Sequence, residues 1–167
     1  LAEELRGYTA RSLGTLMSIS DKLALRNEER WQSFGDRMNP RGPAAICFRG
    51  DIYQGLEAWT LDRRRLAWIQ DHVRILSGLY GLLRPMDVIQ PYRLEMGTRL
   101  KTCEGANLYE FWGNSISKIL QKDLKSMKAT SMINLASDEY SKALDLEGLD
   151  IPVINVKFLQ RDGARDK

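Results

Sequence analysis

Apolar positions recur at helical spacing over the first 34 residues. Leu13 and Met17 share one face of the first run, and the second run continues in the same spacing to Trp31. Thr9 and Ser20 precede the two runs as predicted N-caps, because their short side chains can accept from the first free backbone amides. The pattern therefore predicts two helices that end before the Pro- and Gly-containing loop at residues 39–43.

Later residues alternate between short apolar runs and longer amphipathic ones. The apolar runs predict strands at Ala45–Phe48 (with Cys47 as a buried thiol), Arg74–Tyr80, Met132–Ala136 and Ile151–Leu159. The amphipathic runs predict a helix at Ile52–Ala58, a second one after a Thr60 cap with Leu66, Ile69 and Val73 turned inward, and another after Ser137. They also predict a helix at Leu108–Leu124 behind an Asn107 cap, with Phe111, Ile116, Ile119 and Leu120 as its core stripe. This alternation predicts one mixed α/β (α+β) domain over residues 1–167.

Composition narrows the class of protein. Hydrophobic residues make up 43% of the chain and charged residues 28%, which is typical of a soluble globular protein, and no apolar run approaches the roughly 20 residues of a membrane span. One histidine and two distant cysteines give neither metal-ligand spacing nor a disulfide framework. We therefore expect a cytoplasmic protein without metal, cofactor, membrane contact or disulfide-linked partner, and iron chelation by the chain itself is disfavoured.

Positive charge is concentrated in one region. The net charge is +3, yet residues 61–101 hold eight Lys/Arg and four Asp/Glu. The Arg63–Arg65 triplet lies near the start of a predicted helix, where the helix dipole disfavours cations. These charges either serve a polyanionic partner or form a solvated helix face.

The most informative segment combines apolar pairs with glycines, tyrosines and arginines, at residues 75–85 and 90–97. Arginine offers a planar fork for phosphate, and tyrosine offers a ring on which a base can stack. We predict nucleic-acid contact here by Tyr80, Arg84, Tyr92 and Arg93, with Gly78 and Gly81 allowing close backbone approach. The alternative is an internally paired turn that only packs against the protein.

Two other turns carry polar groups. Arg49 and Asp51 flank Gly50, either as part of a ligand site or as an internal ion pair that braces the turn. Asp51, Glu95 and Glu139 could supply acid–base groups to an enzyme acting on a phosphorylated or nucleotide-like small molecule, with Arg49 and Arg93 holding the anion. No P-loop, dinucleotide fingerprint or nucleophilic serine elbow is present in the sequence, so enzyme activity stays open and a non-enzymatic role is favoured.

Several segments taken in order resemble one known family. They are Ser18–Ala24, Phe48–Tyr53, Leu76–Pro85, Pro91–Gly97, Leu108–Gly113 and Ile133–Tyr140. Together they resemble the YaaA family of peroxide stress response proteins. The resemblance implies a single-domain α/β fold of unusual topology with a positively charged cleft and a helix-hairpin-helix-like element. It also implies a cytosolic protein that binds duplex or structured DNA and limits unincorporated iron during peroxide stress.

The resemblance also has departures. The family's initial strand with a Ser-Pro-Ala-Lys motif and its basic C-terminal region have no counterpart here, so we expect a domain incomplete at both ends, with strand edges left unpaired. The Gly78-Leu79-Tyr80-Gly81 turn is one residue longer than the usual Gly-hydrophobic-Gly hairpin. Within this picture Arg49, Arg84 and Arg93 would contact phosphates, and Tyr80 and Tyr92 would stack on bases or shape the cleft.

Overall fold

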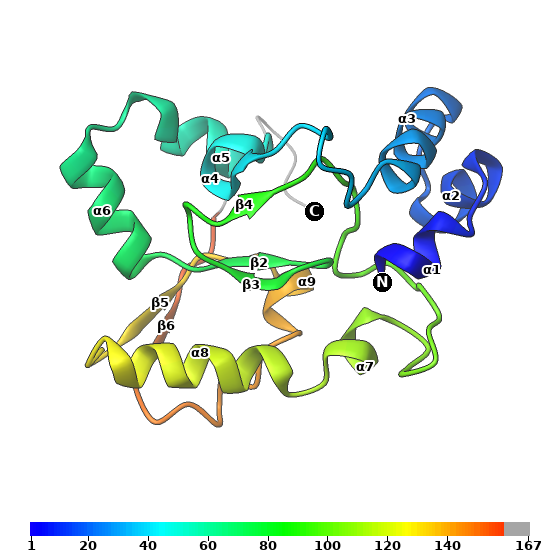
Figure 1. Cartoon of the computed structure of the whole chain (residues 1–167). Helices are drawn as coiled ribbons and strands as arrows, with labels where there is room; N and C mark the ends of the chain where they lie inside the picture. Colours follow the sequence, from blue (N-terminus) through cyan, green and yellow to red (C-terminus); the bar gives the residue numbers. More distant parts are fainter. Residues whose placement is uncertain (159–167) are drawn as a thin grey trace, which may run out of the picture.

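A computed structural model of the chain describes residues 1–158 (Figure 1). Its helices are α1 Ala2–Arg6, α2 Ala10–Met17, α3 Asp21–Gln32, α4 Ala44–Cys47, α5 Asp51–Leu56, α6 Arg63–His72, α7 Leu108–Trp112, α8 Ser115–Ser126 and α9 Asp138–Ser141, with a 3-10 turn at Ala58–Thr60. Its strands are β1 Gly42–Pro43, β2 Ile75–Ser77, β3 Gly81–Leu83, β4 Val88–Ile89, β5 Met132–Asn134 and β6 Val153–Asn155. The fold is mixed α/β, as the sequence predicts.

The strands described form small two-stranded sheets. β1 pairs antiparallel with β4, β2 pairs antiparallel with β3, and β5 pairs parallel with β6. The β2–β3 hairpin runs through the middle of the molecule, with α4, α5 and β4 above it and α8 below it in Figure 1. The hairpin therefore separates two layers of helices.

The first hydrophobic core lies under the N-terminal helices. Leu5, Leu13 and Trp31 are wholly buried there, together with Leu94 and other residues of the segment after β4. α2 begins as predicted, because the Thr9 side chain accepts from the Ser12 amide. These helices thus share a core with residues 94–100, and Leu76 and Leu82 of the β2–β3 hairpin pack against the same core.

A second core lies beside the hairpin. Ala44, Ala45, Ile75, Leu83 and Ile89 are its buried members, contributed by α4, β2, β3 and β4, with Ala58. Tyr92 packs against this core and also against the first one. The segment that follows β4 therefore connects the two cores.

The strand predicted at Ala45–Phe48 is wrong. These residues form the single helical turn α4 and its C-cap, and Cys47 is exposed where the sequence predicted burial. Two backbone amides decide the conformation, because Ala44 donates to the carbonyl of Asp87 and Ala45 to that of Pro85, each at 2.9 Å. Tertiary partners therefore override the apolar pattern.

The predicted Leu108–Leu124 helix is divided. α7 begins at the predicted Asn107 cap, but Gly113 has φ +44° and ends it, and α8 starts again at Ser115. Within α8, Ile116 and Leu120 are buried while Ile119 is 51% exposed, so the predicted stripe is wrong at Ile119. The predicted Thr60 cap is also wrong, since the side chain of Asp62 accepts from the Arg65 amide at 2.8 Å and begins α6.

The last two strands leave apolar side chains in solvent. β5 and β6 lie within the predicted strands, and Leu159 falls outside the described residues. Ile133 and Ile154 are register partners, and they are 61% and 53% exposed. Within residues 1–158, no helix is both long enough and apolar enough to cross a membrane.

Gly78 allows a test of how the turn of the β2–β3 hairpin packs against the segment after β4. A Cβ at Gly78 would lie 2.5 Å from the backbone carbonyl oxygen of Leu94, which cannot move without shifting the segment. We expect Gly78→Ala to lower the free energy of unfolding by about 1–3 kcal/mol, as overpacking does, measured by urea denaturation.

Gly55 is the matched control for this substitution. It lies inside α5, and a Cβ there would meet nothing within 4 Å among the described residues. Gly55→Ala should raise the free energy of unfolding by about 0.5–1 kcal/mol. Equal effects of the two substitutions would show that the Gly78–Leu94 approach is not tight.

Candidate functional site

The two predicted tyrosines meet at the turn of the hairpin. The Ser77 and Tyr92 hydroxyls share a hydrogen bond of 2.6 Å, and the Tyr80 amide donates to the same Ser77 oxygen at 2.9 Å. The Tyr80 hydroxyl accepts from the Gln90 amide at 3.2 Å. We call Ser77, Tyr80 and Tyr92 the hydroxyl node, because their bonds tie the hairpin to residues 90–92.

The Tyr92 ring belongs to an aromatic cluster. Its centroid lies 5.5–6.3 Å from the ring centroids of three neighbours, Trp31, Phe48 and Tyr80. Burial raises the pKa of Tyr92 well above its ordinary range, against the opposing effect of the Ser77 hydrogen bond. Burial likewise raises the pKa of Tyr53 to about 12. Both rings are therefore largely packed against protein.

Gly78 and Gly81 are both buried and both face the protein itself. Gly81 has φ +73°, and a Cβ there would lie 3.0 Å from the Trp112 ring. The Trp112 indole donates to the Gly78 carbonyl at 3.0 Å. The close approaches at these two glycines are thus to Leu94 and Trp112.

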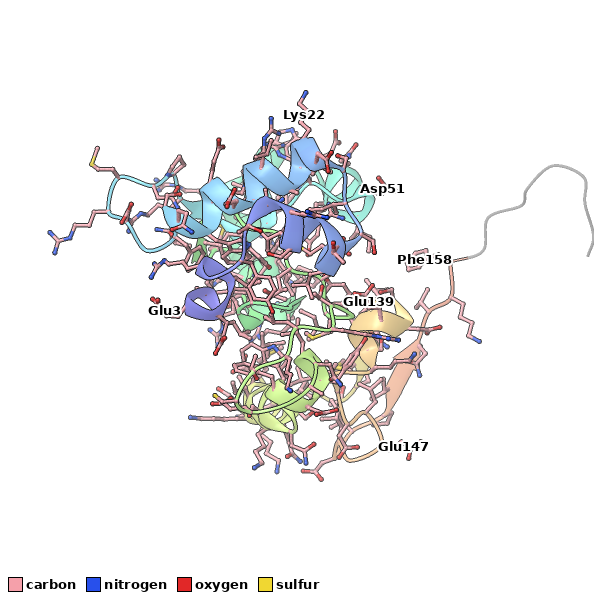
Figure 2. The ribbon with its side chains drawn as sticks, turned by 90° about the vertical axis from the view of Figure 1, so that its right-hand side faces the viewer. Glu3, Lys22, Asp51, Glu139, Glu147 and Phe158 are labelled. Carbon is pink, nitrogen blue, oxygen red and sulfur yellow. The ribbon has the colours of Figure 1, made fainter. Side chains whose placement is uncertain are left out.

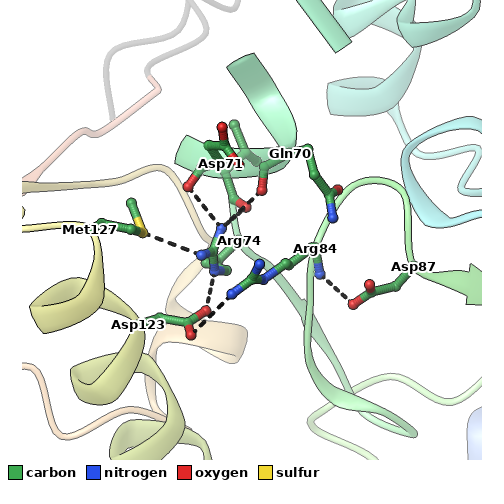
Figure 3. Close-up of polar contacts among 8 residues, drawn as sticks. Gln70, Asp71, Arg74, Arg84, Asp87, Asp123 and Met127 are labelled. Carbon is green, nitrogen blue, oxygen red and sulfur yellow. Dashed lines mark hydrogen bonds and ion pairs between the residues drawn. The ribbon is translucent and has the colours of Figure 1, made fainter. Parts of the chain in front are cut away.

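Arg84 lies at the α8 end of the molecule. Asp123 accepts from Arg74 at 2.5 Å and from Arg84 at 3.3 Å, so one carboxylate binds two guanidinium groups (Figure 3). The Arg74 side chain is 10% exposed and that of Arg84 is 46% exposed. Arg84 therefore has an acidic partner and still presents about half of its side chain to solvent.

Arg93 follows Tyr92 of the hydroxyl node and lies near Arg30 of α3. It pairs with Glu95 at 2.5 Å, and its side chain is 39% exposed. Burial lowers the pKa of Arg30, and the positive charges of nearby Arg26 and Arg93 lower it further. Neither Arg26 nor Arg30 has an ion-pair partner among residues 1–158. We call Arg26, Arg30 and Arg93 the arginine cluster.

The sequence singled out Arg93 but missed Arg26 and Arg30. Their spacing of four residues carried a signal, since it places them one above the other on α3. Trp31 follows Arg30 and packs against Tyr92. This tertiary contact and the packing of Leu94 with Trp31 bring Arg93 close to the same helix.

Two of the three candidate acids lie near each other. The Glu139 carboxylate accepts from the Gly97 amide at 2.7 Å. Burial raises the pKa of Tyr140, and the negative charges of Glu139 and Glu95 raise it further. Asp51 lies in the first turn of α5 and is exposed, and Figure 2 shows it well apart from Glu139. The three carboxylates therefore do not form one constellation.

Arg49 is exposed and lies just before α5. Of the two alternatives for this turn, the internal Arg49–Asp51 ion pair is not formed within residues 1–158. The Arg49 carbonyl accepts from the Gln54 side chain at 3.1 Å. Burial raises the pKa of the nearby Cys47 thiol, while the Arg49 charge acts in the opposite direction. Arg49 is thus a solvated cation, with Arg84 paired to α8 and Arg93 beside α3.

The hollows found on the described surface lie away from the hydroxyl node. Two hollows on the described surface lie at the end of α8, beside Asp150, and along α2, beside Thr9. Residues 1–158 contain no group of three His, Cys, Asp or Glu side chains placed to hold a metal ion. Both cysteines are exposed free thiols.

Comparison with known proteins assigns the family. The family pattern described as Peroxide stress protein YaaA matches residues 1–167. The chain belongs to this family. It is 53% identical over 165 residues to a UPF0246 protein of Phenylobacterium zucineum and 51% identical over 164 residues to one of Caulobacter vibrioides, each match covering 98% of the chain.

Another UPF0246 protein, from Cereibacter sphaeroides, is 53% identical over 166 residues and matches 99% of the chain. The matches cover 62%, 64% and 65% of these three relatives, respectively. The chain thus spans a little under two thirds of the YaaA-family proteins that it matches.

The ion pairs of Asp123 with Arg74 and Arg84 can be tested by measuring stability at different pH values. Burial alone would raise the pKa of Asp123, but the hydrogen bond and charge of Arg74, with help from Arg84, hold it below its ordinary value. A carboxylate whose pKa is lower in the folded protein stabilises the fold at pH values above its unfolded pKa of about 3.9. This stabilisation is lost as the pH falls through the folded-state pKa. Asp123→Asn should therefore lower the free energy of unfolding at pH 7 by about 1–3 kcal/mol.

The difference between the original protein and Asp123→Asn should shrink as pH falls below about 4, measured by urea denaturation across pH. Asp150→Asn is the matched control, because Asp150 pairs with Lys125 at 2.8 Å where both side chains are more than 60% exposed. A difference at Asp123 that is constant with pH would contradict the ionised pairing with Arg74.

Proposed function

We propose that this chain binds DNA in the cytoplasm during the peroxide stress response of its family, and that it helps to limit unincorporated iron and DNA damage. The observation that carries the proposal is the arginine cluster, in which Glu95 is the single carboxylate that pairs with one of three guanidinium groups within residues 1–158. A surplus of positive charge at one place is the electrostatic feature that attracts a phosphate backbone.

The placement of Arg26 and Arg30 supports an anionic partner. Like charges one helical turn apart destabilise a helix by a few tenths of a kcal/mol, and the partial burial of Arg30 adds to this unfavourable effect. A bound phosphate would offset both effects, since a guanidinium group can donate two parallel hydrogen bonds to phosphate oxygens. Arg93 would share that phosphate between α3 and the segment after β4.

Arg49 and Arg84 are further candidates for phosphate contact. Arg49 is exposed, and about half of the Arg84 side chain is exposed despite its pairing with Asp123. Tyr80 and Tyr92 serve this function indirectly in the proposal, because their hydroxyls position the segment that carries Arg93. Residues 1–167 act as one YaaA-like domain in this account.

A second candidate is an enzyme or receptor for a phosphorylated small molecule at the same arginines. It is favoured by three buried polar atoms without a hydrogen-bond partner in the described structure, namely Asn27 Oδ1, Trp31 Nε1 and Arg93 Nε. Buried polar atoms are normally paired, so a bound ligand could satisfy those that it reaches. Glu95 and Glu139 would then be the nearest acid–base groups.

Substitutions of the arginine cluster test the first candidate. Arg26→Ala and Arg30→Ala should each weaken binding to all DNA sequences alike, because phosphate contacts carry no sequence information. Each should also reduce the slope of log affinity against log salt by about 0.9, measured by fluorescence anisotropy with a duplex across a salt series. Lys118→Ala is the control, since it removes an exposed helical cation from α8.

Salt slopes that stay unchanged in both arginine variants would exclude the cluster from DNA contact. Thermal shift with nucleotides and with short duplexes separates the two candidates, because a ligand that binds only the folded protein raises its melting temperature. Stabilisation by a nucleotide without stabilisation by DNA would favour the small-molecule site.

A further inference from the structure

Helix α6 exposes an aromatic pair on its outer face. Trp68 is 59% exposed, and its ring stacks on that of His72 with centroids 4.5 Å apart and planes 8° from parallel. His72 Nδ1 lies 2.8 Å from the Trp68 carbonyl oxygen, which fixes the imidazole one turn further along. The helix therefore presents a preformed flat stack to solvent.

The pattern of α6 places cations beside this stack. Residues four apart lie one turn apart on a helix, so Arg64, Trp68 and His72 form one stripe, and Ile69 is buried on another side. Arg65 lies close to His72 on the helical wheel, at the edge of the same face. We call Arg64, Arg65, Trp68 and His72 the α6 platform.

Among residues 1–158, the platform's arginines have no acidic partner. Both are exposed, and neither makes an ion pair within the described part of the chain. They lie in the first turn of α6, where the helix dipole disfavours positive charge. Asp62, the nearest acid in sequence, has its carboxylate engaged in capping the Arg65 amide. Helix stability therefore does not explain these arginines.

A second exposed indole lies just before the helix. Trp59 is 50% exposed and occupies the 3-10 turn Ala58–Thr60, three residues before Asp62. Large aromatic side chains contribute most to stability when buried. Two half-exposed indoles, close in sequence to arginines that form no ion pair within residues 1–158, therefore indicate a contact surface. Flat rings with adjacent cations suit a nucleic-acid strand, whose bases stack and whose phosphates are anionic.

We propose that the α6 platform binds unpaired nucleotides, with a base stacked on Trp68 and the neighbouring phosphates on Arg64 and Arg65. The parallel Trp68–His72 stack would continue the base stack of a single strand. The inference rests on the proposed DNA-binding function and deepens it, because it names single-stranded regions as the ligand of this face. α6 lies at the opposite end of the molecule from α3 and its arginine cluster (Figure 1).

The test compares single-stranded and duplex DNA. A fluorescein-labelled oligothymidylate of 15 nucleotides and a 15-base-pair duplex are titrated with the full chain and its variants, with anisotropy as the readout. Trp68→Leu keeps an apolar side chain and removes the aromatic ring. It should weaken oligothymidylate binding about 5- to 150-fold, the range expected for the loss of one base–aromatic stack. Trp68→Phe retains a ring and should lose less.

Further variants separate this surface from the arginine cluster. The double substitution Arg64→Ala with Arg65→Ala should reduce the single-strand salt slope by about 1.4, since each phosphate contact to a single strand contributes about 0.7. Lys118→Ala serves again as the control for loss of an exposed cation. Oligothymidylate should also quench the tryptophan emission of the original protein, and most of this quenching should disappear in Trp68→Leu.

The outcomes distinguish the two proposals. Wild-type affinity of Trp68→Leu for oligothymidylate would overturn the α6 platform and leave duplex binding by the arginine cluster unaffected. Equal weakening of Trp68→Leu and Trp68→Phe would show that the ring is not a stacking surface and would also overturn it. Absence of binding to both DNA forms by the original protein would overturn the platform together with the proposed function.

Discussion

The hydrogen bond between Ser77 and Tyr92 is the constraint on which the rest of the arrangement depends. It joins the β2–β3 hairpin to the segment after β4, and Ser77 at the same time accepts from the Tyr80 amide. Tyr92 packs against both hydrophobic cores, so its position determines how the two cores meet. A buried hydroxyl that loses its partner is costly, which makes this pairing specific as well as stabilising.

This constraint also determines where the candidate binding residues lie. Because Tyr92 is held in the aromatic cluster beside Trp31, the next residue, Arg93, lies against α3 and adds to Arg26 and Arg30. The tyrosines that could have stacked on bases are used to build the interior, and their raised pKa values reflect that burial. The exposed aromatic rings beside cations without an ion pair in the described part of the chain lie elsewhere, on α6 and the turn before it.

Local sequence signals predicted the elements that depend on local forces. The Thr9 and Asn107 caps, the N-terminal helices and the hairpin strand at residues 75–77 could be predicted because capping and periodicity act over a few residues. α4 could not, because two carbonyls some forty residues away set its conformation. The ion pair of Arg84 with Asp123 and the approach of Arg93 to α3 likewise join distant parts of the chain, so local patterns could not predict them.

The most direct test of the central constraint is a double-mutant cycle between Ser77→Ala and Tyr92→Phe, measured as free energies of unfolding in urea. Each substitution removes one hydroxyl of the shared hydrogen bond and leaves the carbon framework almost unchanged. The account predicts a coupling energy of about 1 kcal/mol or more, within the range of about 0.5–3 kcal/mol for residues in contact. Strictly additive effects of the two substitutions would contradict it.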